Sequence, residues 1–245
     1  MKMQINTLLN ISVLLNIFFI SLTAFVIYKR GGVLYIYQKI DELIHNRHKY
    51  NASAYYHHKT SQFEILSHSN DNIIFLGDSL TDEGEWLELF NNPQIINRGI
   101  GGDTIEGVLN RIDKVLDSKP AKIFLMIGIN DLAFQHKSLT EVLNLYKVLL
   151  TKIQVVSPQT KVIIQSLLPV NNDKSFLYDN ALIMKFNSQL KELAKEFSHE
   201  YIDIFSCLSD NKNQLDQKYT LDGIHLNGQG YLKWKETIAK YMEND

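Results

Sequence analysis

The chain has 245 residues, of which 45% are hydrophobic and 21% charged, a composition typical of a folded globular protein. Its length fits one domain with an extra segment at one end better than two domains. The formal net charge of −2 gives no indication of a clustered basic face, so nucleic acid is not expected as a partner. The single cysteine, Cys207, excludes a disulfide within the chain.

An uncharged, strongly apolar segment at residues 5–28 comes first. About 20 such residues cross a bilayer as a helix. The segment is longer than the apolar core of a signal peptide and lacks an Ala-x-Ala cleavage site after it, whereas a buried core helix would show a polar stripe. We therefore predict an uncleaved, single-pass membrane anchor over residues 1–30. The flanking basic residues leave the side of the membrane undetermined.

Residues 31–70 connect this predicted anchor to the rest of the chain. Gly31-Gly32 ends the apolar helix, and the following residues mix aromatic and charged side chains without low complexity. We predict a mostly helical connector that packs on the main domain or on a second copy of the chain. A homodimer is left open, because no heptad pattern supports one.

Residues 71–245 alternate short apolar runs with longer helical stretches. The nearly all-apolar runs predict strands that are buried on both faces, and helical spacers between them indicate a parallel sheet. We therefore predict an α/β fold, a three-layer α/β/α sandwich with a five-stranded parallel sheet, and Asn227 as the N-cap of its last helix. The predicted strands are 73–76, 94–97, 122–127, 161–167 and 201–204, and the predicted helices are 104–117, 139–156, 178–197 and 228–241.

Polar motifs follow the predicted strands, at the edge where open parallel sheets form their sites. Gly77-Asp78-Ser79-Leu80 follows the first strand, and a glycine-rich loop containing Gly102 follows the second. Asn130 follows the third strand, and Asp222-Gly223-Ile224-His225 comes after the fifth. Each motif alone also fits a turn or a helix cap. Their shared placement at one edge favours a functional site.

The residue types suit nucleophilic catalysis. A serine hydroxyl is a weak nucleophile until a base takes its proton, and that base needs a third group to hold its tautomer. The chain supplies these groups in the order Ser79, Asp222, His225. No Gly-x-Ser-x-Gly motif is present, which separates the chain from the α/β-hydrolases.

The four motifs together resemble the SGNH (GDSL) hydrolase superfamily, and they span residues 77 to 225. Residues 99–104 and 86–90 resemble the branch that contains platelet-activating-factor acetylhydrolase catalytic subunits and bacterial acyl-esterases. The resemblance implies a flavodoxin-like sheet and a catalytic triad of Ser79, Asp222 and His225. It implies an oxyanion hole made by the backbone N–H groups of Ser79 and Gly102 and the side-chain amide of Asn130, with no cofactor and no metal ion. We expect glycine at 102 because a side chain there would obstruct the amide.

The expected function is that of a serine esterase or acylhydrolase acting on carboxylic esters, with short acyl or O-acetyl esters on glycans or lipids as substrates. One alternative is an O-acyltransferase that acts on envelope glycans with the same triad. Others are a lysophospholipase or thioesterase, and a non-catalytic, membrane-tethered binding module. Candidate residues for lining a substrate pocket are Leu80, Trp86, Leu168, Pro169, Val170 and Leu226.

Overall fold

The computed structural model describes scattered positions between residues 12 and 32, and then residues 52–66, 71–135, 137–174 and 179–242. The chain divides into two compact units, residues 1–51 and 52–245. In the first unit the described positions between 12 and 29 are helical. No helix among the described residues is long and apolar enough to cross a membrane. Most of the predicted anchor, and residues 33–51 of the predicted connector, lie outside the described residues.

The second unit is built on a five-stranded parallel sheet, as predicted, with strand order β2-β1-β3-β4-β5. Every residue of β1 and β3 is buried, because helices cover both faces of the sheet. Gly77 at the end of β1 pairs with Gly99 of β2 and Met126 of β3, so the strands end together at one edge. The strands are β1 (Ile73–Gly77), β2 (Ile95–Gly99), β3 (Lys122–Met126), β4 (Lys161–Gln165) and β5 (Glu200–Ile202).

The fourth strand is shorter than predicted. It ends at Gln165, and the next apolar residue, Leu167, lies outside the strand. The Leu167 N–H donates to Oδ1 of Asn187, and the Leu167 carbonyl oxygen accepts from Nδ2 of the same side chain. A buried asparagine thus replaces the neighbouring strand as hydrogen-bond partner, which an apolar run does not reveal.

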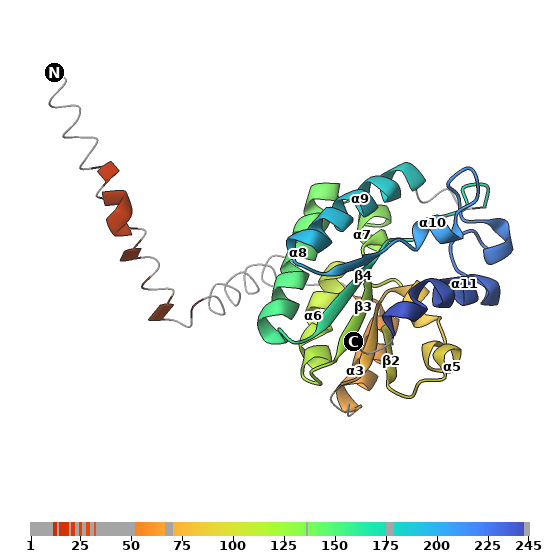
Figure 1. The fold of residues 1–245 in the computed structure, drawn as a ribbon, viewed down its shortest axis with the longest axis horizontal. Helices are drawn as coiled ribbons and strands as arrows, with labels where there is room; N and C mark the ends of the chain where they lie inside the picture. Colours follow the sequence, from red (N-terminus) through yellow and green to blue (C-terminus); the bar gives the residue numbers. More distant parts are fainter. Residues whose placement is uncertain are drawn as a thin grey trace, which may run out of the picture. The chain divides into compact units, whose positions relative to one another are not determined.

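Helices cover the two faces of the sheet, so the predicted α/β/α layering is confirmed (Figure 1). One group contains α6 (Ile105–Leu116), α8 (Leu139–Val156) and α9 (Asn180–Glu196), and the other contains α5 (Trp86–Phe90) and α11 (Gly228–Ile238). Asn227 caps α11, as predicted. The remaining α-helices of the second unit are α3 (Ala54–Ile65), α4 (Ser79–Asp82), α7 (Ile129–Ala133) and α10 (Phe205–Leu208), with 3₁₀ turns at Gln217–Tyr219 and Ala239–Tyr241.

Aromatic stacking joins the sheet to the second helix layer. The ring of Phe75 on β1 lies between Phe124 and Trp86, with centroids 4.8 Å and 4.3 Å away. Trp86 also meets Trp234 of α11 edge to face. All four rings are buried, and burial of such large apolar surfaces fixes α5 and α11 against the sheet.

Candidate active site

Ser79 lies where β1 ends and α4 begins. The turn is tight, because a Cβ on Gly77 would stand 2.3 Å from the Met126 carbonyl oxygen. Asp78 caps the helix, and its Oδ1 accepts a 3.2 Å hydrogen bond from the Leu80 N–H. Strand and cap together hold Ser79 at the carboxyl edge of the sheet, beside a cavity.

His225 and Asp222 reach Ser79 from a turn just before α11. Nε2 of His225 lies 3.2 Å from Oγ of Ser79, and Nδ1 lies 2.7 Å from Oδ2 of Asp222. The other oxygen of Asp222 accepts the backbone N–H groups of Ile224 at 2.9 Å and His225 at 2.8 Å. Gly223 between them has a φ of +90°, which favours glycine. The structure therefore brings together the three residues predicted from the motifs.

Asp222 is charged at neutral pH. Burial disfavours its ionised form, but hydrogen bonds from the His225 side chain and from two backbone N–H groups outweigh burial and lower the pKa of Asp222 to about 2. A carboxylate at this point holds a proton on Nδ1 of the imidazole and leaves Nε2 to accept the serine proton. Glu83 adds a second, more distant carboxylate, with Oε1 3.8 Å from Nε2 of His225.

The two other candidate oxyanion donors border the same cavity as Ser79. One N–H of the Asn130 side chain donates to the Asp103 carbonyl oxygen at 2.8 Å, which orients the amide and leaves its second N–H. Gly102 has a φ of +75°, and a Cβ there would meet nothing within 4 Å. The positive φ favours glycine at this position. The expected obstruction of the amide by a side chain stays a prediction.

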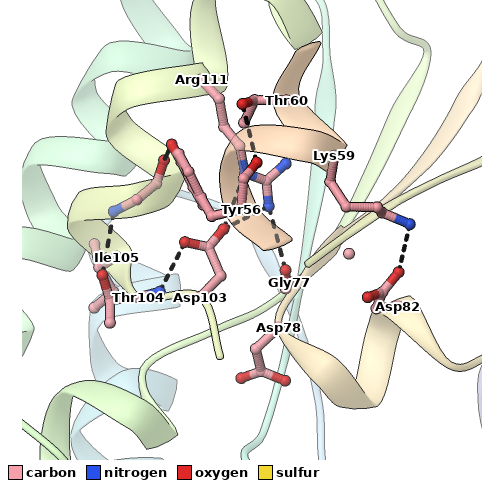
Figure 2. Close-up of polar contacts among 12 residues, drawn as sticks. Tyr56, Lys59, Thr60, Gly77, Asp78, Asp82, Asp103, Thr104, Ile105 and Arg111 are labelled. Atoms are coloured by element: carbon pink, nitrogen blue, oxygen red, sulfur yellow. Dashed lines mark hydrogen bonds and ion pairs between the residues drawn. The ribbon is translucent and has the colours of Figure 1, made fainter. Parts of the chain in front are cut away.

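Buried polar contacts hold the loops that carry these donors (Figure 2). Nε of Arg111 donates to Oδ2 of Asp103 at 2.9 Å, and Nη2 donates to the Gly77 carbonyl oxygen at 3.2 Å. Oδ2 of Asp131 accepts the Ile105 N–H at 3.0 Å. The sequence analysis missed Arg111 and Asp103, because their partners lie on separate segments and no spacing rule joins them. They connect the ends of β1 and β2 to the start of α6.

A cavity of about 260 Å³ opens beside Ser79, and its lining is mostly apolar. Four of the six predicted lining residues border it, namely Leu80, Leu168, Pro169 and Val170. Trp86 does not, because it is buried in the core and donates from Nε1 to the Thr81 carbonyl oxygen. Leu226 is buried and does not border the cavity either. Lining residues that the sequence analysis missed are Met126, Ile129, Phe134, Leu167 and Ile224.

Asp78 is a buried acid next to the candidate nucleophile. Burial raises its pKa to about 7, against the hydrogen bond from Leu80 that favours the charged form. Its Oδ2 has no hydrogen-bond partner among the described residues. Asp78 therefore holds its proton through the mildly acidic range, which keeps an unpaired charge out of the site.

Within the described ranges, no cluster of three or more histidine, cysteine or acidic side chains could hold a metal ion. The chemistry available at this edge is that of a hydroxyl, an imidazole, a carboxylate and oriented N–H groups. A Ser–His–Asp arrangement at the carboxyl edge of a parallel α/β/α sheet is one that serine hydrolases use.

Comparison with known proteins gives the family. The model of the GDSL-like Lipase/Acylhydrolase family matches residues 75–233, and the chain belongs to this family. The protein is accordingly an enzyme that hydrolyses ester bonds.

Similar proteins include the human platelet-activating factor acetylhydrolase IB subunit alpha2, which is 29% identical over 168 residues, 66% of this chain and 71% of that protein. An Escherichia coli N-acylneuraminate cytidylyltransferase is 28% identical over 212 residues, which cover 84% of this chain but 46% of that protein. The solved structure of a candidate platelet activating factor from Streptococcus pneumonia has a TM-score of 0.71 and 29% identity. That match covers 77% of this chain and 93% of the other.

Proposed function

We propose that this protein is a serine esterase that hydrolyses carboxylic esters with short acyl groups, with Ser79, His225 and Asp222 as its catalytic triad. The observation that carries the proposal is the 3.2 Å contact between Oγ of Ser79 and Nε2 of His225, whose Nδ1 lies 2.7 Å from Asp222. These are the distances of hydrogen bonds that can pass a proton.

In the proposed mechanism, Oγ of Ser79 attacks the acyl carbonyl carbon while Nε2 of His225 takes the hydroxyl proton. The carbonyl oxygen becomes an oxyanion, which the N–H groups of Ser79, Gly102 and Asn130 stabilise. Collapse of this intermediate breaks the ester bond, and His225 gives its proton to the leaving alkoxide. Water then attacks the acyl-serine with His225 again as base, releasing the acid and restoring Ser79.

Asp222 assists both steps without moving a proton itself. Its charged carboxylate stabilises the imidazolium that forms when His225 takes the serine proton. The low pKa of Asp222 keeps this charge in place at any pH where an esterase operates.

A short acyl group fits the cavity better than a long one. The volume of about 260 Å³ is at the lower end for small-molecule sites, and the lining of Leu167, Leu168 and Ile129 suits a small apolar group. The human relative at 29% identity is named an acetylhydrolase, which supports an acetyl or similar ester. A lysophospholipase or thioesterase acting on long chains is less compatible with this volume.

Hydrolysis is favoured over acyl transfer by the exposure of the site. The side chains of His225 and Asp222 are 36% and 53% exposed, so water reaches the base directly. Transfer to a sugar hydroxyl would use the same triad, and it is distinguished by where the acyl group goes.

The test is hydrolysis of p-nitrophenyl acetate, butyrate and octanoate by the full chain. We expect acetate and butyrate to be cleaved faster than octanoate, and Ser79→Ala to lower kcat by a factor on the order of 10⁶. Ser206→Ala is the matched control, since Ser206 is exposed and its hydroxyl donates to Asp203. Turnover that survives Ser79→Ala, or a phosphonate label on a serine other than Ser79, would refute the proposal. Acyl groups recovered on an added sugar instead of as free acid would favour the acyltransferase.

Attachment to a membrane through the uncharged residues 5–28 is proposed on sequence alone. Fractionation of cells that express the full chain tests it, because an anchored protein stays with membranes after alkaline extraction and requires detergent for release. Recovery in the soluble fraction would contradict the proposal.

A further inference from the structure

Helix α3 precedes the part of the chain that matches the family model, yet it contacts the residues that follow Ser79. Nζ of Lys59 donates to Oδ1 of Asp82 at 2.7 Å, and the Tyr55 hydroxyl donates to Oδ2 of Asp82 at 2.6 Å. Asp82 is the last residue of α4, the helix that begins with Ser79. Two side chains of α3 thus converge on one carboxylate of the nucleophile helix, as Figure 2 shows for Lys59.

The same carboxylate holds the loop that carries Gly102. Oδ2 of Asp82 accepts the Gly101 N–H at 3.1 Å. The Tyr55 ring packs on Gly101 as well, because a Cβ there would lie 3.4 Å from Cε1 of the ring. The end of β2 and the end of α4 lie very close together at Gly99. A Cβ there would stand 2.1 Å from the Asp82 nitrogen, so this position requires glycine.

A hydrogen bond from the Asp103 N–H to the Ile100 carbonyl oxygen, at 3.1 Å, closes a turn around Gly101 and Gly102, and contacts with other segments fix where this turn lies. Two consecutive glycines have many accessible backbone conformations, and the N–H of Gly102 belongs to the peptide plane that joins them. On the far side of the loop, Asp103 is fixed by its ion pair with Arg111. On the near side, the side-chain contact that holds Gly101 is Asp82, with Tyr55 behind it.

Burial makes Asp82 dependent on α3. Its side chain is only 9% exposed, so most of its charge must be compensated by protein groups. Lys59 supplies an opposite charge and Tyr55 a hydroxyl donor. The hydrogen bond to Asp82, with burial second, raises the pKa of Tyr55 to about 12, so the hydroxyl keeps its proton as a donor.

We propose that Asp82, held by Tyr55 and Lys59 of α3, is a positioning residue: through the Gly101 N–H it anchors the turn that contains the Gly101–Gly102 peptide, so that the Gly102 N–H faces the oxyanion. The proposal rests on the proposed function, in which Gly102 stabilises that oxyanion. It gives a segment outside the family match a part in catalysis, although α3 does not border the substrate cavity.

A positioning role predicts a specific kinetic pattern. The hydrogen bond from the Gly102 N–H to the substrate oxygen becomes strong only when negative charge develops on that oxygen, so its loss should lower kcat more than it changes KM. In the full chain, Asp82→Ala is expected to lower kcat for p-nitrophenyl acetate about 10–100-fold and to leave KM within about twofold, less than the loss of a whole oxyanion donor. Tyr55→Phe and Lys59→Met, which each remove one contact to Asp82, are expected to lower kcat about 2–10-fold. Asp82→Asn keeps a carbonyl oxygen for Gly101 and is expected to restore most of the activity lost in Asp82→Ala.

Lys147→Met is the matched control for Lys59→Met, since it also removes a lysine ion pair, that with Glu196, far from the loop. All rates are divided by the number of active sites titrated with a fluorophosphonate, so that unfolded protein does not count as a loss of kcat. If Asp82→Ala does not fold, Tyr55→Phe decides the question, because it removes a single oxygen atom.

Unchanged kcat per active site in both Tyr55→Phe and Lys59→Met would overturn the proposal, and so would equal losses in Asp82→Asn and Asp82→Ala. Equal losses in Lys59→Met and Lys147→Met would indicate a general effect on stability and would also overturn it. Failure of the proposed function is recognised separately, because Ser79→Ala would then keep its activity.

Discussion

The two halves of the candidate site are held in different ways. Asp222 and His225 form an exposed turn, with side chains 53% and 36% exposed, and the carboxylate binds backbone N–H groups within three residues of itself. In the half that carries the oxyanion donors, the side chains that hold the loop are buried, with Asp103 and Arg111 0% and 6% exposed. The proton-transfer half is therefore organised by local sequence, and the oxyanion half by contacts between distant segments.

This difference separates two kinds of control over the reaction. The turn from Asp222 to His225 is held by its own hydrogen bonds, so the position of His225 follows from where α11 packs on the sheet. The loop with two glycines is closed by one local hydrogen bond, from the Asp103 N–H to the Ile100 carbonyl oxygen, and its position depends on side chains of the surrounding segments. Substitutions in the first half should act on the chemistry directly, whereas substitutions of the side chains that hold the second half should act on the chemistry through geometry.

The largest effect is expected from a substitution in the half of the site that carries Asp222 and His225. Asp222→Asn keeps the shape of the side chain but removes the charge that holds Nδ1–H of His225, so we expect kcat to fall by a factor on the order of 10⁴. Steady-state kinetics on p-nitrophenyl acetate measure the change, and the control is Asp203→Asn, at another exposed aspartate that accepts a backbone N–H. A loss below tenfold would show that Asp222 does not support the base.

A smaller effect is expected from the buried half. Asn130→Ala removes one donor to the oxyanion, and we expect kcat to fall on the order of 10²–10³-fold with KM nearly unchanged. Asn72→Ala, at another buried asparagine at the opposite end of β1, should affect stability but not kcat. A change confined to KM in Asn130→Ala would mean that Asn130 binds the substrate and not the oxyanion.

The smallest effect concerns stability and the buried acid beside Ser79. The pKa of Asp78 is raised from 3.8 to about 7 by burial, so between these values the folded state keeps a proton that the unfolded state has lost. The free energy of unfolding should therefore fall as pH rises from about 4 to about 7, by an amount on the order of a few kcal/mol. Asp78→Asn should abolish this dependence, as measured by urea unfolding at several pH values.

Asp216 is expected to give a pH dependence of stability with the opposite sign, which Asp216→Asn should remove. The hydrogen bond from Lys218 lowers the pKa of Asp216, so its contribution to stability is present above the ordinary aspartate pKa and is lost as pH falls below it. If the free energy of unfolding falls equally between pH 4 and pH 7 in the wild type and in Asp78→Asn, the protonated state of Asp78 is contradicted.

Much of the fold was predictable from the sequence because its signals are short-range. The apolar runs at 73–76 and 122–127 predicted two central strands, β1 and β3, and Asn227 marked the start of α11. The meeting of Ser79 with His225 followed from one rule, that parallel strands end at a common edge. The boundary at Leu167 was not predictable, since a side chain from α9 competes with the sheet for its backbone groups.

By itself, the sequence determined the parallel sheet, the motifs at its carboxyl edge and the serine chemistry they offer, because each depends on periodicity or on residues a few positions apart. The tertiary structure decided which side chains line the cavity, why Trp86 is in the core, and how Arg111, Asp82 and α3 hold the oxyanion loop. Those contacts join residues far apart in the sequence, such as Arg111 and Gly77, which are 34 positions apart. Partners at such separations leave no periodic signal and are chosen only when the helices pack on the sheet.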